Sequence, residues 1–286
     1  MKNTWGGAPF NLAVHAGRCG LQAGIVSALG GDPLGNEALA AANSLGVDCR
    51  FVRVVPDTPT GRVDVTVSSE GQPHYVIHEQ VAFDEIVVDA STQAAILAED
   101  YDVFCLGTLA QRFETSRASL QRLIEAFQGT STRIFYDVNL RQHYYDRDVL
   151  EKSLQASHIL KLNDDEAATV SRMFLGHCTG SLRDICHGLA DRFDLRVVLI
   201  TLGAEGAGVY HEEGYRVVPG HSVEVADTIG AGDAFSAAFL NDYLRNGDPV
   251  TAVQVANAIG GYVASQPGAL PSYGDAQSEI LKRTRS

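Results

Sequence analysis

The segment best suited to chemistry is a glycine-rich turn at residues 227–233, which reads Asp227-Thr228-Ile229-Gly230-Ala231-Gly232-Asp233. An apolar run typical of a helix follows it directly. A helix start offers unpaired N–H groups and the positive end of its dipole, and glycines let a ligand approach the backbone, so this turn can bind an anion. The dipole also favours the ionised form of Asp233, which can accept a proton from a hydroxyl. A base beside an anion site suits attack of an alcohol on a phosphoryl group.

The turn alone is also compatible with a structural role in which Asp233 only caps the helix. Two other phosphate-binding loops are excluded by spacing. A Walker A loop needs Lys and then Ser or Thr after its last glycine, and no such segment is present. The glycines of residues 203–208 have the wrong order for a dinucleotide loop, and strand-like residues follow them. A Rossmann dehydrogenase is therefore disfavoured.

Further polar residues lie where predicted strands end. Asn163 follows an apolar run, and Glu166 stands three residues later in the first turn of a predicted helix, so both can point to one spot, such as a hydrated Mg²⁺ ion. The alternative is a capping box between the two residues, and both roles can hold at once. Arg141, which ends the segment Asp137-Val138-Asn139-Leu140-Arg141, is our candidate for the cation of the site; a surface ion pair is its alternative.

The elements that must position these residues alternate between strands and helices. Apolar runs predict strands at residues 24–29, 103–106, 134–138, 159–162 and 197–201. Helical spacing covers residues 11–19, 34–45, 115–127, 148–156, 165–173, 182–193, 233–245 and 250–265. This order predicts an α/β fold whose mostly parallel sheet has helices on both faces. At residues 61–78 the period changes to two, with a turn at 69–72, which predicts an inserted β-hairpin.

Composition and charge limit the classes of partner. The 286 residues include 22 Lys and Arg against 35 Asp and Glu, and the net charge of −13 argues against nucleic acid and anionic membranes as partners. No apolar run is long enough for a membrane helix and no signal-peptide pattern is present, so we expect a cytoplasmic protein. Five cysteines without a C-x-x-C pair indicate neither a disulfide framework nor a zinc site. An anionic ligand would need backbone amides and a divalent cation.

Five segments, in order along the chain, resemble the PfkB, or ribokinase-like, family of carbohydrate kinases. Residues 227–233 are similar to its C-terminal signature, and residues 6–11, Gly-Gly-Ala-Pro-Phe-Asn, resemble its sugar-binding segment. Residues 163–166 match its N-x-x-E motif, residues 201–206 resemble its nucleotide-binding turn, and Asn257 falls in the helix that borders adenine. The resemblance extends from Gly6 to about Ser272.

The resemblance implies a three-layer αβα, ribokinase-like fold, with residues 1–286 as one domain and a small β lid around residues 51–80. It implies ATP-dependent phosphotransfer to a hydroxyl of a small free sugar, with fructose as the first candidate. Asp233 would be the base, and the amides of Gly230, Ala231 and Gly232 would form the anion hole. The lid would close over the sugar to exclude water and would offer a homodimer contact.

The resemblance also implies the binding residues. The sugar would contact Gly6, Gly7, Asn11, Arg141 and Asp233. ATP would bind near Asn163, Glu166, Thr201, Gly203, Gly206 and Asn257, with Asn163 and Glu166 acting on Mg²⁺ through water. Asp227 and Ser272 would belong to a loop that holds a monovalent cation, K⁺.

Alternatives to fructose are ribose and 2-keto-3-deoxygluconate. Adenosine and sugar phosphates fit less well, because no extra cationic cluster marks a second phosphate pocket. Family members usually begin with a strand whose Asp binds sugar hydroxyls, whereas here only five residues precede Gly6. We therefore expect roughly 20 to 30 further residues ahead of Met1, enough for a strand and a turn. An alternative of another class is a non-catalytic sugar or nucleotide sensor that lacks this strand.

Overall fold

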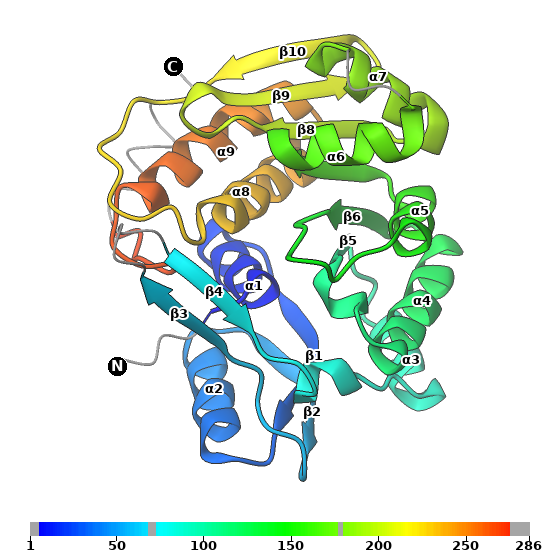
Figure 1. The fold of residues 1–286 in the computed structure, drawn as a ribbon, viewed down its shortest axis with the longest axis vertical. Helices are drawn as coiled ribbons and strands as arrows, with labels where there is room; N and C mark the ends of the chain where they lie inside the picture. Colours follow the sequence, from blue (N-terminus) through cyan, green and yellow to red (C-terminus); the bar gives the residue numbers. More distant parts are fainter. Residues whose placement is uncertain (1–5, 68–72, 177–179, 275–286) are drawn as a thin grey trace.

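A sheet of mixed direction lies between the helices (Figure 1). In this computed structural model, which describes residues 6–67, 73–176 and 180–274, the strand order is β10-β9-β8-β7-β6-β5. The strands are β5 (Val103–Gly107), β6 (Arg133–Asp137), β7 (Ile159–Asn163), β8 (Val197–Thr201), β9 (Gly206–His211) and β10 (Gly214–Pro219). Strands β5 to β8 are parallel, and β9 and β10 extend the sheet in antiparallel fashion. The predicted α/β fold with a mostly parallel sheet is confirmed.

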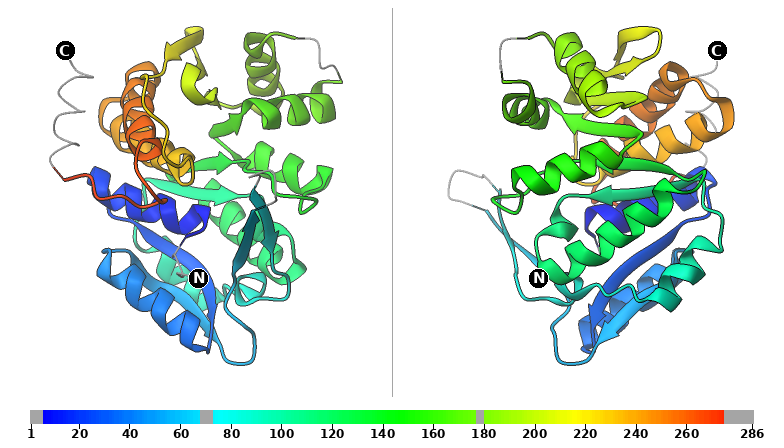
Figure 2. Two further views of the ribbon diagram at one scale, coloured as in Figure 1. Left: turned by 60° about the vertical axis from the view of Figure 1, so that its left-hand side comes forward. Right: turned by 90° about the vertical axis from the view of Figure 1, so that its right-hand side faces the viewer.

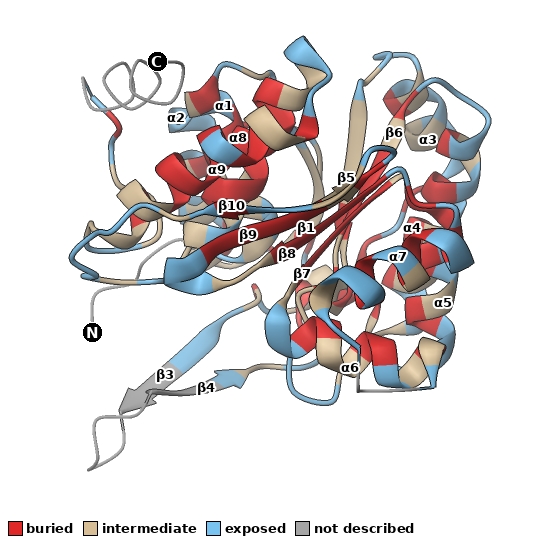
Figure 3. Cartoon of the chain, turned by 90° about the horizontal axis from the view of Figure 1, so that it is seen from above, coloured by how far each residue is buried: buried red, intermediate tan, exposed pale blue. Residues whose placement is uncertain are grey.

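Helices cover both faces of this sheet (Figure 2). One layer contains α3 (Ala90–Leu97), α4 (Glu114–Gln128), α5 (Arg147–Ala156), α6 (Asp164–Leu175) and α7 (Leu182–Phe193); the other contains α1 (Ala8–Cys19), α8 (Ala231–Asn246) and α9 (Pro249–Ala264). Along β8, Val198 and Ile200 belong to the core beneath the first layer, whereas Val197 and Leu199 belong to the core beneath the second. The central strands are therefore buried on both faces (Figure 3), which explains their continuous apolar sequence.

Each predicted helix and strand is present, with ends shifted by a few residues. The sequence pattern does not predict β2 (Asp48–Val55), in which arginines interrupt the apolar pattern, or the edge strand β10, of which little is buried. It also does not predict α3, which buries only Ile96 and so lacks a helical period. Short 3₁₀ helices at Ala82–Glu85, Leu109–Gln111 and Gly203–Glu205 complete the connections. No helix in the described part of the chain is long and apolar enough to cross a membrane.

The parallel strands form two separate sheets. Strand β1 (Gly24–Gly30) pairs in parallel with β2, next to helix α2 (Pro33–Ser44). Within residues 6–67, 73–176 and 180–274, β1 pairs only with β2, and β5 pairs only with β6. Helix α1 contacts both β1 and β5. The additional strand expected ahead of Met1 stays a prediction.

A β-hairpin extends away from these layers (Figure 3). Its strands β3 (Val63–Val67) and β4 (Pro73–Ile77) are antiparallel, and Val63 lies opposite Ile77. The hairpin was predicted, while its predicted turn at residues 69–72 lies outside the described residues. The range 51–80 expected for the lid also contains the second half of β2, which belongs with β1.

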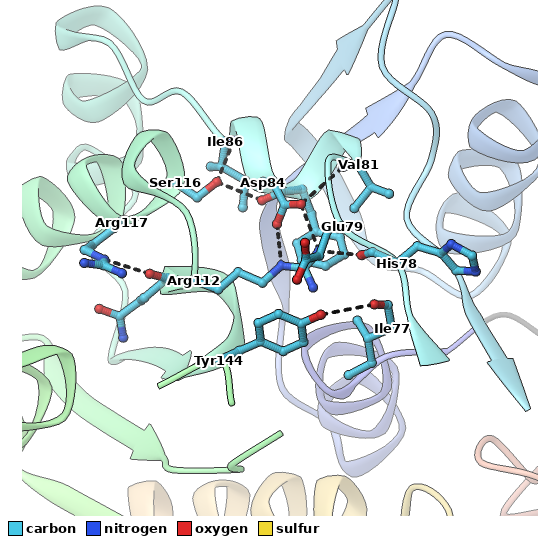
Figure 4. A network of polar contacts seen from close by, with 12 residues as sticks. Ile77, His78, Glu79, Val81, Asp84, Ile86, Arg112, Ser116, Arg117 and Tyr144 are labelled. Atoms are coloured by element: carbon cyan, nitrogen blue, oxygen red, sulfur yellow. Dashed lines mark hydrogen bonds and ion pairs between the residues drawn. The ribbon is translucent and has the colours of Figure 1, made fainter. Parts of the chain in front are cut away.

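A buried arginine holds the base of the hairpin (Figure 4). The side chain of Arg112 is only 2% exposed, and it donates to both carboxylate oxygens of Asp84 at 2.7 and 2.8 Å. It also donates to the carbonyl of His78 at 2.6 Å, where the chain leaves β4. The rings of Phe83 and Tyr144 lie 4.6 and 4.8 Å from the guanidinium carbon. The ion pair with Asp84 holds Arg112 in place, and the Arg112 hydrogen bond to His78 fixes the end of β4 to the body of the protein.

We predict that Arg112→Met lowers the free energy of unfolding by about 3–5 kcal/mol, because it leaves the Asp84 carboxylate buried without its partner. Urea unfolding of the variant and the wild type measures this difference. Arg216→Met, which removes an ion pair whose side chains are both more than half exposed, is the control and should leave stability nearly unchanged. Equal losses in the two variants would contradict the prediction.

Candidate active site

Two helix starts from opposite ends of the chain meet at Asp233. Helix α8 begins after Gly230, which has a left-handed φ of +81°, and Asp233 lies in its first turn. Asn11 lies in the first turn of α1 and is 3% exposed. The Asn11 Nδ2 atom donates to Asp233 Oδ2 at 2.8 Å. The structure thus brings together the predicted base and a predicted sugar-binding residue 222 positions apart.

Burial, not the helix dipole, dominates the protonation of Asp233. The sequence predicts an ionised carboxylate, but burial raises its pKa to about 6. The hydrogen bond from Asn11 lowers the pKa, the charge of Asp137 raises it, and the charge of Lys161 lowers it. At neutral pH the carboxylate is mostly ionised, yet its pKa is close enough to 7 for it to accept a proton from a substrate and release it later.

Lys161 is a buried cation beside Asp233, and the sequence motifs do not include this residue. Its Nζ lies 2.8 Å from Asp137 Oδ2, and the two residues are register partners on β7 and β6. Burial alone would lower the pKa of Lys161, but the charges of Asp137, Glu166 and Asp233 outweigh burial and raise it. A lysine within the run Ile159-Leu160-Lys161-Leu162 was the available signal, because a strand buried on both faces rarely holds a charge.

Arg141, the predicted cation of the site, is exposed. Its Nη1 donates to the carbonyl of its neighbour Leu140 at 3.0 Å, and its charge lowers the pKa of Asp233 only as a minor contribution. Gly6 and Gly7 lie directly before α1, where Gly7 is the N-cap with a φ of +107°. A positive φ is strained for residues other than glycine, which explains Gly7. Gly6 and Gly7 both lie next to Asn11, whose backbone amide donates to the Gly7 carbonyl at 2.9 Å.

The predicted anion hole lies at the start of α8, against the loop at residues 268–272. A Cβ atom on Gly230 would lie 2.5 Å from the carbonyl oxygen of Ala269, so only glycine fits. A Cβ on Gly232 would lie 3.7 Å from Lys161 Nζ, which places the cation beside the turn. The amide of Ala231 donates to Thr228 at 3.3 Å, whereas first-turn amides such as that of Gly232 have no carbonyl one turn back to bond. Anion binding there stays a prediction.

Asn163 and Glu166 form the capping box that was weighed as an alternative. Asn163 Oδ1 accepts from the Glu166 amide, and Glu166 Oε2 accepts from the Asn163 amide, both at 2.8 Å. Glu166 Oε1 accepts from the amide of Leu140 at 2.9 Å, which fixes the loop after β6. Burial raises the pKa of Glu166, while these amides and Lys161 oppose that effect. Both carboxylate oxygens therefore hold backbone in place.

The residues predicted to bind ATP gather around the β8–β9 turn. Thr201 is the register partner of Asn163, at the end of the neighbouring strand. Gly203 and Gly206 flank a 3₁₀ turn with φ of +56° and +100°, and a Cβ on Gly206 would lie 2.2 Å from the Val218 carbonyl oxygen. Asn257 Nδ2 donates to that same carbonyl at 3.0 Å. The two strand ends, the turn and α9 thus form one continuous region.

The residues expected to hold metal ions engage mainly backbone groups. Asp227 accepts from the amides of Ile229 at 3.0 Å and Gly268 at 3.2 Å, and the Ser272 carbonyl accepts from the Tyr262 hydroxyl at 2.9 Å. Among the described residues, no group of three or more His, Cys, Asp or Glu side chains could hold a metal ion. Asn163 and Glu166 fit Mg²⁺ only through water, in keeping with the waters that this ion usually retains.

A cavity of about 460 Å³ lies between the start of α2 and the base of the hairpin. Asp32, Thr60, His78 and Glu79 are among its lining residues. Asp32 accepts from the Thr60 amide at 2.8 Å, the Thr60 hydroxyl at 2.7 Å and the Gly35 amide at 2.7 Å, and the bonds from Thr60 lower its pKa. Asp32 is therefore an ionised cap of α2 that ties the chain ahead of β3 to this helix.

Residues 1–275 match the family described as pfkB family carbohydrate kinase. Fructokinase-1 of Oryza sativa subsp. japonica is 28% identical over 291 residues, which cover 98% of this chain and 88% of the rice protein. An ATP-dependent ribose-1-phosphate kinase of Halopiger xanaduensis is 30% identical, over 94% of this chain and 83% of that protein. The structure of an uncharacterized sugar kinase of Pyrococcus horikoshii in complex with ATP is 27% identical, with a TM-score of 0.80 over 98% of this chain and 89% of that one.

The raised pKa of Asp233 predicts that Asp233→Asn stabilises the protein at neutral pH. A carboxyl with a folded-state pKa of about 6, against 3.8 when unfolded, loses stability as pH rises through this interval. The variant removes that loss, so its advantage over the wild type should grow by about 2 kcal/mol between pH 4 and pH 8. Urea unfolding at the two pH values measures it.

Asp89→Asn is the matched control, because hydrogen bonds from Thr92 lower the pKa of this helix cap to about 2. The stability of Asp89→Asn relative to the wild type should fall, not rise, as pH increases. A pH-independent difference between Asp233→Asn and the wild type would show that Asp233 titrates normally.

Proposed function

Because the chain belongs to the PfkB family of carbohydrate kinases and is an ATP-dependent sugar kinase, we propose that it phosphorylates a hydroxyl of a small free sugar with Asp233 as the base. The observation that carries this proposal is the hydrogen bond between Asn11 and Asp233 at the meeting of two helix starts. Such a site supplies a proton acceptor, an amide donor for a sugar oxygen and free backbone N–H groups in one place.

The proposed reaction transfers the terminal phosphoryl group of ATP. The sugar hydroxyl gives its proton to the Asp233 carboxylate, and its oxygen attacks the γ-phosphorus. The bond from that phosphorus to the β–γ bridging oxygen breaks, and ADP leaves with that oxygen. In this proposal the amides of Gly230 and Gly232, joined by that of Ala231 when it leaves the Thr228 carbonyl, and the ammonium of Lys161 stabilise the negative charge on the phosphoryl oxygens of the transition state.

ATP occupies, in this proposal, the region formed by Thr201, Gly203, Gly206 and Asn257. Mg²⁺, held through water by Asn163 and Glu166, supplies positive charge to the phosphates. The capping box supports this assignment, since it fixes both side chains at the ends of β7 and α6. The loop with Asp227 and Ser272 is our proposed site for a monovalent cation.

The hairpin is our proposed lid over the sugar. Arg112 fixes only its base, so the strands β3 and β4 can close over a bound sugar and exclude water from the transferred group. Val63 and Val76 are 50% and 41% exposed on these strands. Exposed valines on a β-ribbon support the proposal that two lids meet in a homodimer.

Fructose is the first candidate for the sugar. The name of the rice relative supports fructose, while the name of the haloarchaeal relative supports a phosphorylated pentose. Ribose and 2-keto-3-deoxygluconate remain alternative candidates for the sugar. The raised pKa of Asp233 and the charge of Lys161 beside it argue against a non-catalytic sensor, because binding alone does not need a carboxylate of raised pKa.

Release of ADP across a panel of sugars, with Mg²⁺ and K⁺ present, tests the function. We predict that Asp233→Asn lowers kcat at least about 10²-fold while ATP binding, measured by calorimetry, stays nearly unchanged. Asp89→Asn, on a surface helix far from Asp233 in the chain, should keep wild-type turnover. Wild-type turnover in Asp233→Asn would remove Asp233 from the base role, and no ADP release with any sugar would refute the proposed function.

Glu166→Gln tests the metal side of the site. We predict that this variant needs more Mg²⁺ for half-maximal rate, because the amide is neutral, while KM for the sugar changes little. Gln can still accept one backbone hydrogen bond, so the cap is largely kept. Titrating Mg²⁺ and sugar separately measures the two effects, and a selective rise in sugar KM would contradict this placement.

A further inference from the structure

One face of helix α1 contacts the active-site segments at three successive points. Asn11 donates to Asp233, His15 hydrogen-bonds the Ala269 carbonyl through Nε2 at 2.9 Å, and Arg18 donates to the Pro271 carbonyl at 2.8 Å. The spacings of four and three residues place these side chains on one side of the helix. A single rigid helix thus contacts both the base and the loop at residues 268–272.

That loop lies directly behind the start of α8. Its residue Ala269 packs against Gly230, because a Cβ on Gly230 would lie 2.5 Å from the Ala269 oxygen and 2.9 Å from its Cα. The carbonyl oxygen that His15 holds is therefore the atom nearest to where a Cβ of Gly230 would lie. If this carbonyl moved toward the helix, it would collide with Gly230. If it moved away, Gly230 would lose its packing contact with Ala269.

His15 is suited to hold this carbonyl without change over the physiological pH range. Its side chain is 0% exposed, and burial lowers its pKa to about 4, so the ring is neutral. A carbonyl can only accept, which assigns the single ring proton to Nε2. Nδ1 then accepts from the Tyr273 hydroxyl at 2.7 Å, so both ring nitrogens are used. Tyr273, 4% exposed, stacks on the same ring at 5.7 Å between centroids.

We propose that His15 is a positioning residue for phosphoryl transfer: by holding the Ala269 carbonyl, it fixes Gly230 and the amides at the start of α8 relative to the base. The proposal rests on the proposed function, because it concerns the same anion hole and the same base. Asn11 fixes the base and His15 fixes the amides from one helix, so α1 sets the distance between the two.

His15→Leu tests this role, because leucine keeps much of the volume and removes both hydrogen bonds. We expect kcat to fall about 10- to 100-fold, because the amides are misplaced and not removed, with KM for ATP and sugar changed less than about threefold. His15→Gln can still reach the Ala269 carbonyl with its amide and should recover most of kcat. Tyr273→Phe, which leaves the Nε2 bond intact, should also keep most of it.

Leu123→Ala is the control for lost stability. Leu123 is 0% exposed in α4, in the opposite helical layer, and its truncation leaves a cavity in the core that lowers the melting temperature. Assayed below its melting temperature, this variant should keep wild-type kcat. A folded His15→Leu with wild-type kcat, or a loss no greater than that of Leu123→Ala, would overturn the proposal.

Hydrogen exchange separates this proposal from the function itself. Amides of residues 228–235 should exchange faster in His15→Leu than in the wild type, but not in His15→Gln. If the wild type releases no ADP with any sugar and this exchange pattern is nevertheless found, the proposed function fails and the positioning by His15 stands. Unchanged exchange at these residues in His15→Leu would overturn the positioning, whatever the activity.

Discussion

The charge balance at the carboxyl ends of the parallel strands is the constraint on which the site depends. Three carboxylates, Asp137, Glu166 and Asp233, lie close enough to influence one another, and Lys161 is the buried cation among them. Without hydrogen-bond donors or a cation, neighbouring carboxylates out of water would favour their protonated forms. The Asn11 amide and the charge of Lys161 both lower the pKa of Asp233, which burial raises, and the pKa of about 6 leaves this carboxylate mostly ionised at pH 7.

The surrounding fold serves this balance by supplying backbone amides. Glu166 is satisfied by the amides of Asn163 and Leu140, and Asp233 is bonded by a side-chain amide from α1. The structural role of Glu166 and its proposed role toward Mg²⁺ therefore fall on one side chain, because the cap that begins α6 also places this carboxylate at the carboxyl edge of the sheet. A substitution there changes helix start, loop position and local charge together.

Much of the fold could be predicted because the core strands and amphipathic helices carry strong periods. The strands β2 and β10 and the helix α3 could not be predicted, since their burial is only partial. In the site, the motifs located Asn11, Asn163, Glu166 and Asp233. The raised pKa of Asp233 and the cation Lys161 depend on which side chains the sheet register places side by side, and a single sequence does not contain that register. The position of Arg141 after a strand suggests a cation of the site; the structure shows this side chain exposed, with a minor lowering effect on the pKa of Asp233, and its role stays a prediction.

The separation of β1 and β2 from the main sheet has a mechanical consequence. In the described chain no ladder of backbone hydrogen bonds joins β1 to β5, so contact between the two sheets depends on side-chain packing and on α1. The helix that touches both sheets is also the helix that carries Asn11, so a change in how α1 packs on β1 or β5 reaches Asp233 through the Asn11 hydrogen bond.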